Sequence, residues 1–334
     1  MKERITQKDL AVHLGLSQSG ISMALRGDPR IGKATQAKVR AAAEAMGYRP
    51  DPVMGALAGY RAAKSAKRYV GTLALLLPCR VEADYLNSPF AAGLVGGVRE
   101  ASEEMGYRCE TFVLGQRPFA RTLSILRSRG IRGMVVGPVG KDAPVAPAIE
   151  GLTIVQVGRG WGQTGHHRVT TNHFDNLRLA WNVLRERGYE RIGLFLRAGN
   201  DNLTDGRWVA AYLYMQARAG IPPLPVGDNT QDLAEWFRAC HPDAIIASDQ
   251  WLRARLEETM GVRAPADIGF AALGVPGGTE PTSGVFQRPH EIGRVAAQLL
   301  DLSLRSYEDK PTAVPIINVI NGEWHEGDSL RPPR

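Results

Sequence analysis

The chain has 334 residues, of which 44% are hydrophobic and 22% charged; this length predicts two or three folded units, and this composition excludes collagen-like, disordered and coiled-coil proteins. No apolar run reaches the length of about 18 to 20 residues that a membrane span needs, and the polar N-terminus lacks a secretory apolar segment, so we expect a cytoplasmic protein without a membrane partner. The formal net charge is +7, and residues 1–68 hold 13 lysines and arginines against 5 aspartates and glutamates, which is typical of a nucleic-acid-binding head on a nearly neutral body.

The N-terminal unit contains signals for three short helices. Thr6 followed three positions later by Asp9 predicts a capping box at the start of the first helix, and Gly15 permits the left-handed turn that ends it. Ser17 can cap a second helix, and a third is expected over about Lys33–Met46. The inner face of this third helix is expected to comprise Val39, Ala42 and Met46. Two helices joined by a glycine turn predict a helix-turn-helix, although helical hairpins of this kind also occur in plain bundles.

The second helix is expected to turn its apolar side chains inward and to leave a polar face outside. Its inner residues are Ile21, Ala24 and Leu25. Its outer residues, with one beside the N-terminus, are Gln18, Ser19, Ser22, Met23 and Arg26. A glutamine matches adenine with two hydrogen bonds, serine pairs with donors or acceptors, and methionine offers apolar contact to a thymine methyl group. These residues are therefore candidates for reading base edges.

Four ordered segments carry a resemblance to a known family: Ile5–Ala11, Gly15–Ser17, Ile21–Ser22 and Gly47–Pro50. They resemble the lactose/galactose repressor (LacI/GalR) family of bacterial transcriptional regulators. The resemblance implies a DNA-binding domain over residues 1–49 whose second helix enters the major groove, with Thr6 and Ser17 also at the DNA. Met23 departs from the arginine that is common in the family, which removes a guanine-reading group, so the family's usual operator is not expected.

Residues 50–68 are expected to form a hinge helix and linker. Pro52 could start a helix, but Gly55 and Gly59 make so short a segment a weak helix former in water, so it would fold only against a partner. A plain basic linker is the alternative. Leu57 and Ala58 resemble the family's hinge signature, in which a leucine from each of two subunits wedges into the minor groove.

From residue 69 onward, apolar runs of strand length alternate with helical stretches. These segments are Tyr69–Leu77, Phe90–Met105, Tyr107–Val113, Phe119–Arg129, Ile131–Gly137, Leu152–Val157, Phe174–Arg187, Arg191–Leu196, Arg207–Ala219, Ala244–Ala247, Trp251–Met260, Ile268–Leu273 and Pro289–Arg305. So many units predict an α/β body with two doubly wound lobes over residues 69–334. The alternation by itself fits a binding protein and an enzyme equally well.

Further landmarks of the family follow in order along this body: Ser88–Phe90, Glu186–Tyr189, Arg207, Ser248–Asp249, Pro265–Ile268 and Glu291–Gly293. They imply a domain like the periplasmic sugar-binding proteins, which takes a small-molecule effector between its lobes, in a homodimer or a tetramer. By position, Phe90 would line the cleft, Arg207 would donate a charged fork to a ligand oxygen, and Asp249 would lie near the cleft mouth. The alternatives are a surface arginine at a helix start for Arg207 and an ordinary acid at a helix N-terminus for Asp249. Gly274 stands where the family commonly has an aspartate after a strand, which removes an acceptor for sugar hydroxyls.

Signals for catalysis, cofactors and metals are weak. The segment Gly27–Ala34 nearly spells a phosphate-binding loop but lacks the final hydroxyl, and no nucleophile motif occurs. The three cysteines are far apart, and a polar stretch through His166 and His167 has no acid at ligand spacing. We therefore expect no enzyme, no cofactor and no metal site. The leading hypothesis is a DNA-binding transcriptional regulator, a repressor that senses a small molecule and binds double-stranded operator DNA. The alternative is a small-molecule-binding protein or an enzyme whose basic N-terminal appendage is structural.

Overall fold

The computed structural model describes residues 5–25, 31–48, 69–116, 118–138, 149, 151–159, 165–277, 281–306 and 314–333. The chain divides into two compact units, Met1–Arg68 and Tyr69–Arg334. We call the first unit the head and the second the body. Within the described ranges, no helix has both the length and the apolar composition that a membrane crossing requires.

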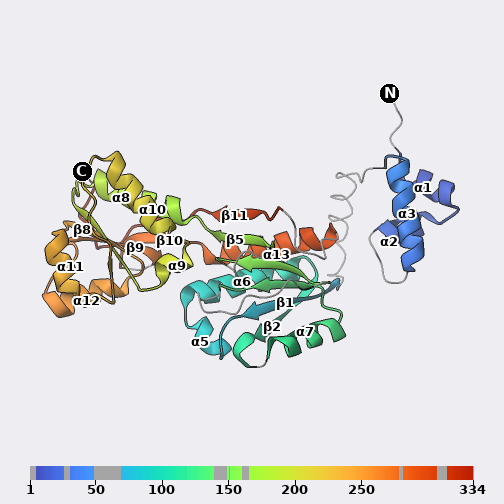
Figure 1. Ribbon diagram of the computed structural model, residues 1–334, viewed down its shortest axis with the longest axis horizontal. Helices are drawn as coiled ribbons and strands as arrows, with labels where there is room; N and C mark the ends of the chain where they lie inside the picture. Colours follow the sequence, from blue (N-terminus) through green and yellow to red (C-terminus); the bar gives the residue numbers. More distant parts are fainter. Residues whose placement is uncertain are drawn as a thin grey trace. The chain divides into compact units, whose positions relative to one another are not determined.

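Three helices form the described part of the head (Figure 1): α1 (Gln7–Leu14), α2 (Gln18–Leu25) and α3 (Lys33–Ala45). They enclose a small core in which Leu10, Ile21 and Val39, one from each helix, are fully buried. Burial of a side chain of this size contributes about 1.5–3 kcal/mol to folding. The expected inner residues of α3 all contact this core, but Ala43 is buried beside Val39 while Ala42 and Met46 are half-buried. The stripe thus follows i, i+4 from Val39.

The body contains two sheets, and each defines one lobe. The sheet of lobe one has the order β11-β5-β4-β3-β1-β2, with every pairing parallel. Its strands are β1 (Gly71–Leu77), β2 (Tyr107–Val113), β3 (Gly133–Val136), β4 (Thr153–Val157), β5 (His167–Thr171) and β11 (Ile317–Ile320). Leu73, Leu75 and Leu77 belong to one core cluster and Ala74 and Leu76 to another. The uninterrupted apolar run of β1 therefore reflects a strand buried on both faces.

Helices cover both faces of this sheet. They are α5 (Glu82–Leu86), α6 (Pro89–Glu104), α7 (Phe119–Ser128) and α13 (Pro289–Arg305), with a 3-10 turn η1 (Leu114–Gln116). Figure 1 shows α6 and α13 side by side, and both pack on the face that carries Leu73 and Leu75. Leu126 of α7 packs on the opposite face with Leu76. Ser88 begins α6 by accepting a hydrogen bond from the amide of Ala91 at 3.5 Å.

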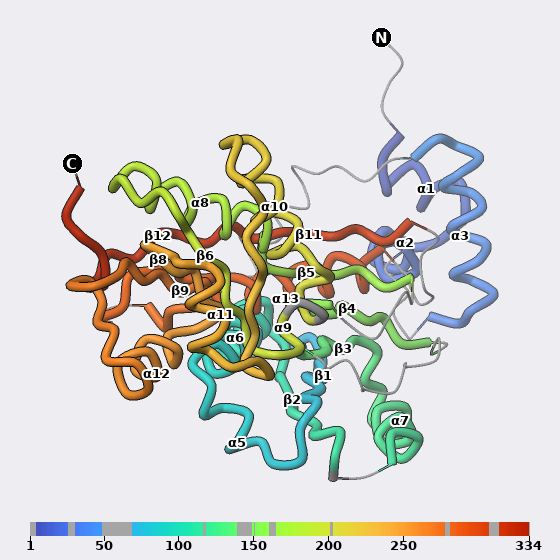
Figure 2. Tube along the Cα trace, turned by 60° about the vertical axis from the view of Figure 1, so that its left-hand side comes forward, coloured from blue at the N-terminus to red at the C-terminus, as the bar shows by residue number. Residues whose placement is uncertain are grey.

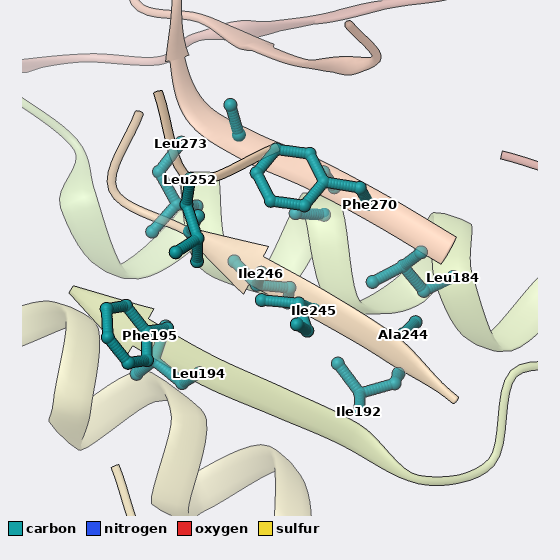
Figure 3. Close-up of a cluster of buried hydrophobic side chains, with 14 of the residues drawn as sticks. Leu184, Ile192, Leu194, Phe195, Ala244, Ile245, Ile246, Leu252, Phe270 and Leu273 are labelled. Carbon is teal, nitrogen blue, oxygen red and sulfur yellow. The ribbon is translucent and has the colours of Figure 1, made fainter. Parts of the chain in front are cut away.

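Lobe two has the sheet order β12-β10-β9-β8-β6-β7, parallel except for the β10–β12 pair. Its strands are β6 (Ile192–Leu196), β7 (Gly227–Asp228), β8 (Ala244–Ala247), β9 (Gly269–Val275), β10 (Gly284–Phe286) and β12 (Glu323–His325). Its helices are α8 (His173–Glu186), α9 (Asn200–Leu203), α10 (Arg207–Arg218), α11 (Leu233–Cys240) and α12 (Trp251–Met260). Figure 3 shows Ile245 and Ile246 of the central strand β8 between Leu194 of β6 and Phe270 of β9.

The chain passes between the lobes at three places in the described residues: from β5 to α8, from β10 to α13 and from β11 to β12. Figure 2 shows β11, close to the C-terminus, beside β5 at the edge of lobe one. Hydrogen bonds tie the crossings together. The amide of Asn172 donates to the carbonyl of Ile320 at 2.9 Å, and its side chain donates to Oδ1 of Asn321 at 2.7 Å. Thr171 also donates to Oε1 of Gln287 at 3.3 Å.

The prediction of an α/β fold with a small helical head and two doubly wound lobes is confirmed. The polar stretch after His166 is strand β5, in which every residue except Arg168 is buried. Helix α11 lacked a counterpart among the expected segments. Strand β9 extends to Val275, so Gly274 lies inside the strand rather than after it.

Candidate functional site

Two caps fix the entry into the helix-turn-helix of the head. The amide of Thr6 donates to Oδ2 of Asp9 at 2.7 Å, and the amide of Asp9 donates back to Oγ1 of Thr6 at 3.4 Å, which completes the predicted capping box. The hydroxyl and amide of Thr6 lower the pKa of Asp9, because they stabilise its charged carboxylate. Gly15 ends α1 at φ 67° and ψ 29°, a conformation that favours glycine.

A second cap sets the start of α2. Oγ of Ser17 accepts a hydrogen bond from the amide of Gly20 at 3.1 Å and lies 3.1 Å from Oγ of Ser19. The predicted cap is thus present, and the hydroxyl of Ser17 is engaged in it. Ile21 and Ala24 are buried in the head core. Because the helix has a period of about 3.6 residues, the residues between them lie on the opposite face of α2, away from the core.

The predicted base-reading residues on the opposite face of α2 differ in their exposure to solvent. Gln18 and Ser19 are exposed, whereas Ser22 and Met23 are half-buried. The N-terminal end of the helix therefore offers the most accessible side chains. Arg26, Leu57 and Ala58 lie outside the described residues.

The other two helices of the head carry exposed cations. Lys8, Lys33, Lys38 and Arg40 are all exposed. Exposed lysines and arginines are the groups that neutralise DNA phosphates. The head thus combines exposed amide and hydroxyl side chains with surface positive charge.

In the body, Arg207 belongs to a charged cluster that joins the two lobes. Arg207 is the first residue of α10, and its guanidinium donates to Oδ2 of Asp205 at 2.9 Å and to the carbonyl of Thr204 at 3.2 Å. Arg159, which follows β4 of lobe one, forms an ion pair with Oδ1 of Asp205 at 3.1 Å. Arg168 of β5 lies 3.7 Å from Oδ2 of the same carboxylate. We call Arg159, Arg168, Asp205 and Arg207 the lobe junction.

Burial is the largest influence on the pKa of Arg168 in the lobe junction and of His173 beside it. Burial lowers the pKa of Arg168; Asp205 opposes this effect, and Arg207 and Arg159 add to it. Burial also lowers the pKa of His173 to about 4, with Arg207 adding to the effect and Asp205 opposing it. At neutral pH the ring of His173 is therefore uncharged.

Two buried nitrogen atoms next to the junction have no hydrogen-bond partner among the described residues. These are Nδ1 of His173 and Nε1 of Trp208. The two rings pack edge to face, with centroids 5.2 Å apart, and Trp208 is 4% exposed. Buried polar groups are nearly always paired in folded proteins, so these two nitrogen atoms can serve a bound molecule.

Each of the three body residues singled out by the sequence has its own partners in the structure. Asp249 accepts from Nε of Arg197 at 3.1 Å and from the amide of Trp251 at 3.2 Å, as a helix-start acid does. Phe90 is half-buried against the core of lobe one. Among the described residues, no hydrogen bond or ion pair joins Phe90, Arg207 and Asp249 to one another.

Sequence reasoning missed Arg159, Arg168, Asp205 and Trp208. The Asp205–Gly206 pair is a turn signal that precedes α10 and could have drawn attention to this loop. The pairing of Asp205 with Arg159 and Arg168 joins two lobes and has no sequence signal.

Comparisons with known proteins match part of the body to a binding-protein domain and most of the chain to a transcriptional regulator. Residues 182–330 match the family described as a periplasmic binding protein-like domain. The HTH-type transcriptional repressor CytR of Escherichia coli (strain K12) is 25% identical over 327 residues, 88% of this chain and 88% of that protein. The maltose regulon regulatory protein MalI of the same strain is 26% identical over 225 residues, 66% of this chain and 61% of that protein. The chain thus spans less than two thirds of the length of MalI.

Solved structures share the fold. The transcriptional regulator CelR in its cellobiose complex superposes with a TM-score of 0.62 at 21% identity, covering 98% of this chain and 100% of that chain. The lac repressor dimer bound to operator and the anti-inducer ONPF gives a TM-score of 0.58 at 16% identity, with the same coverage. Three observations agree with one another. They are the ordered motifs of head and body, the two-lobed fold, and the likeness to regulators along most of the chain. In its motifs, its fold and its likeness to transcriptional regulators, the chain resembles the lactose/galactose repressor (LacI/GalR) family.

Proposed function

We propose that the protein is a sequence-specific DNA-binding transcriptional regulator, a repressor, whose body binds a small-molecule effector. It acts in the cytoplasm on double-stranded operator DNA and has no catalytic activity. The outer face of α2 enters the major groove, and the body transmits the state of its ligand to the head.

One observation carries the DNA-binding half of this proposal. Gln18 and Ser19 stand exposed at the start of a helix whose opposite face is buried, which is the arrangement that a recognition helix requires. The net positive charge of the head supplies the affinity for phosphates that does not depend on sequence. A structural appendage would need neither an exposed amide face nor this excess of charge.

The protein is proposed to act as a homodimer, or as a tetramer built from two dimers. Two heads would then read the two halves of a pseudo-palindromic site. Between head and body, Leu57 and Ala58 are proposed to contact the minor groove at the centre of the operator, with Leu57 as the wedge.

The effector is proposed to bind between the lobes at Arg207, with Phe90 and Asp249 farther out. The lobes are joined by the three crossings described above, and hydrogen bonds at Asn172 and Gln287 link these crossings. Segments of this kind absorb the rotation when two lobes close on a ligand. The cellobiose bound to CelR supports a small-molecule effector for this chain.

Selection of DNA from a random duplex pool by the full-length protein tests the proposal. If the protein is a sequence-specific regulator, the selected DNA should be enriched in one sequence with two related half-sites. If the protein is instead an enzyme or a stand-alone binding protein with a basic appendage, it should bind DNA without enriching any sequence. That outcome would contradict the proposed function.

A further inference from the structure

We infer that the effector is an anion, whose carboxylate or phosphate group takes the place of the Asp205 carboxylate among Arg159, Arg168 and Arg207. The inference rests on the proposed function, because it names the ligand class of the same body. It assigns to Asp205 the role of an internal anion that competes with the ligand.

The charge balance of the lobe junction is the first reason. Three guanidinium groups lie within 3.7 Å of one carboxylate, at 2.9, 3.1 and 3.7 Å. One negative charge therefore faces three positive charges, and the surplus is positive. Guanidinium groups bind carboxylate and phosphate oxygen atoms in pairs of parallel hydrogen bonds, which suits a ligand with two or more anionic oxygen atoms.

The burial of these groups is the second reason. The side chain of Arg168 is 17% exposed, so little water reaches its charge. Arg168 donates a hydrogen bond to the carbonyl of Arg159 at 2.9 Å and shares Asp205 with two other guanidinium groups, so its buried charge lacks a carboxylate of its own, which is costly. An anionic ligand at the junction would relieve the repulsion between the three cations, as Asp205 does in its absence.

The backbone at Asp205 is the third reason. Asp205 has φ 53° and the following Gly206 has φ 70°. Left-handed geometry at a residue other than glycine is uncommon, and such residues concentrate at ligand-binding sites. Here the geometry directs a carboxylate of lobe two toward Arg159 and Arg168 of lobe one.

The unpaired nitrogen atoms of Trp208 and His173 indicate the rest of the ligand. Trp208 follows Arg207 in α10, and the charges of Arg207 and Asp205 act on His173. The indole nitrogen only donates a hydrogen bond, so it needs an oxygen acceptor. An oxygen-rich anion such as a sugar acid, a sugar phosphate or a hydroxylated carboxylate supplies that acceptor as well as the charge, whereas a neutral sugar lacks the charge.

The test uses Asp205→Asn in the full-length protein. Asparagine tolerates left-handed geometry, so the turn is preserved while the internal carboxylate is removed. Thermal unfolding is followed by tryptophan fluorescence while potassium phosphate or potassium citrate is added, with potassium chloride at matched ionic strength and glucose as references. Phosphate and citrate separate a preference for phosphate from one for carboxylate.

Asp205→Asn should show a saturable rise in midpoint temperature with at least one of the two anions. Its apparent dissociation constant should be about tenfold lower than that of the unchanged protein, because a competing charge is gone. The double variant Asp205→Asn with Arg168→Gln should lose this response. Arg129→Gln, which removes a guanidinium from an exposed ion pair with Glu110 in lobe one, should respond as the unchanged protein does.

Two results would overturn the inference. One is that Asp205→Asn responds to phosphate and citrate no more than to potassium chloride, which would make the cluster a simple latch between lobes. The other is that glucose raises the midpoint as much as the anions do. Selection from random DNA needs no anion, so the proposed function and the anion site can fail separately.

Discussion

Gly97 of α6 lies so close to His290 of α13 that a Cβ atom on Gly97 would overlap the carbonyl oxygen of His290. The two helices therefore approach through their backbones, and Gly293 makes the reciprocal approach to the carbonyl of Leu94. This crossing joins the segment after β1 to the segment that returns from lobe two. This contact sets how α13, which follows β10 of lobe two, packs on lobe one.

Gly97→Ala should destabilise the protein, because the added methyl group meets backbone atoms that cannot rotate away. We expect a loss of about 1–3 kcal/mol in the free energy of unfolding, which is typical of overpacking. Urea unfolding followed by circular dichroism measures it.

Gly96→Ala is the matched control. A Cβ atom there would have the Cδ2 atom of His290 as its nearest neighbour at 3.7 Å, an ordinary contact. Replacing a helical glycine by alanine without a clash stabilises a helix by up to about 1 kcal/mol. Equal effects of the two substitutions would contradict the close helix crossing.

His173 should make the body less stable in mild acid. Its pKa in the folded protein is about 4, below the ordinary value near 6.5. Between these pH values the unfolded chain binds a proton that the folded chain does not, so the free energy of unfolding falls as the pH falls, by up to about 1.4 kcal/mol per pH unit.

His173→Gln removes this contribution. From pH 6.5 to pH 5, the unchanged protein should lose about 2 kcal/mol more stability than the variant. All six tryptophans lie in residues 69–334, so tryptophan fluorescence during urea unfolding follows the body. Parallel pH profiles of the two proteins would show that His173 is accessible to protons in the fold.

Local signals were enough to predict most of the fold. The apolar runs predicted β1 and β8, and the Thr6 and Ser17 caps placed α1 and α2, because caps and periodicity act within a few residues. Helix α11 also had a local signal that was not used: Asp232 caps it, and Leu233, Trp236 and Cys240 form its buried stripe.

Other features depend on contacts between distant segments. β11 pairs with β5 although about 150 residues separate them. Its residues alternate between exposed (Ile317, Val319) and half-buried (Asn318, Ile320), so apolar side chains do not mark its less exposed face. Arg207 could be singled out from the sequence. Its partner Asp205 and the cations Arg159 and Arg168 are defined only once the lobes are folded together.

DNA affinity should depend steeply on salt. The head carries a net charge of +8 in residues 1–68, and a dimer that neutralises about six to ten phosphates releases as many counterions. Affinity should then drop by roughly 10³ to 10⁵ between 50 and 200 mM salt. Fluorescence anisotropy of the full-length protein on labelled duplex measures this slope, and a flat titration would show that the head is not the DNA-binding unit.

Base reading by the outer face of α2 is tested most directly by repeating the random-duplex selection with Gln18→Ala, Met23→Ala and Lys64→Ala. Gln18→Ala and Met23→Ala should each change the preferred base at particular positions, with a loss of about 1–3 kcal/mol at a base pair. Lys64 is one of the basic residues in the expected linker at 50–68, and Lys64→Ala should weaken binding to all sequences alike, as loss of a phosphate contact does. Unchanged base preferences in both α2 variants, with the head still folded, would contradict the assignment of α2 as the recognition helix.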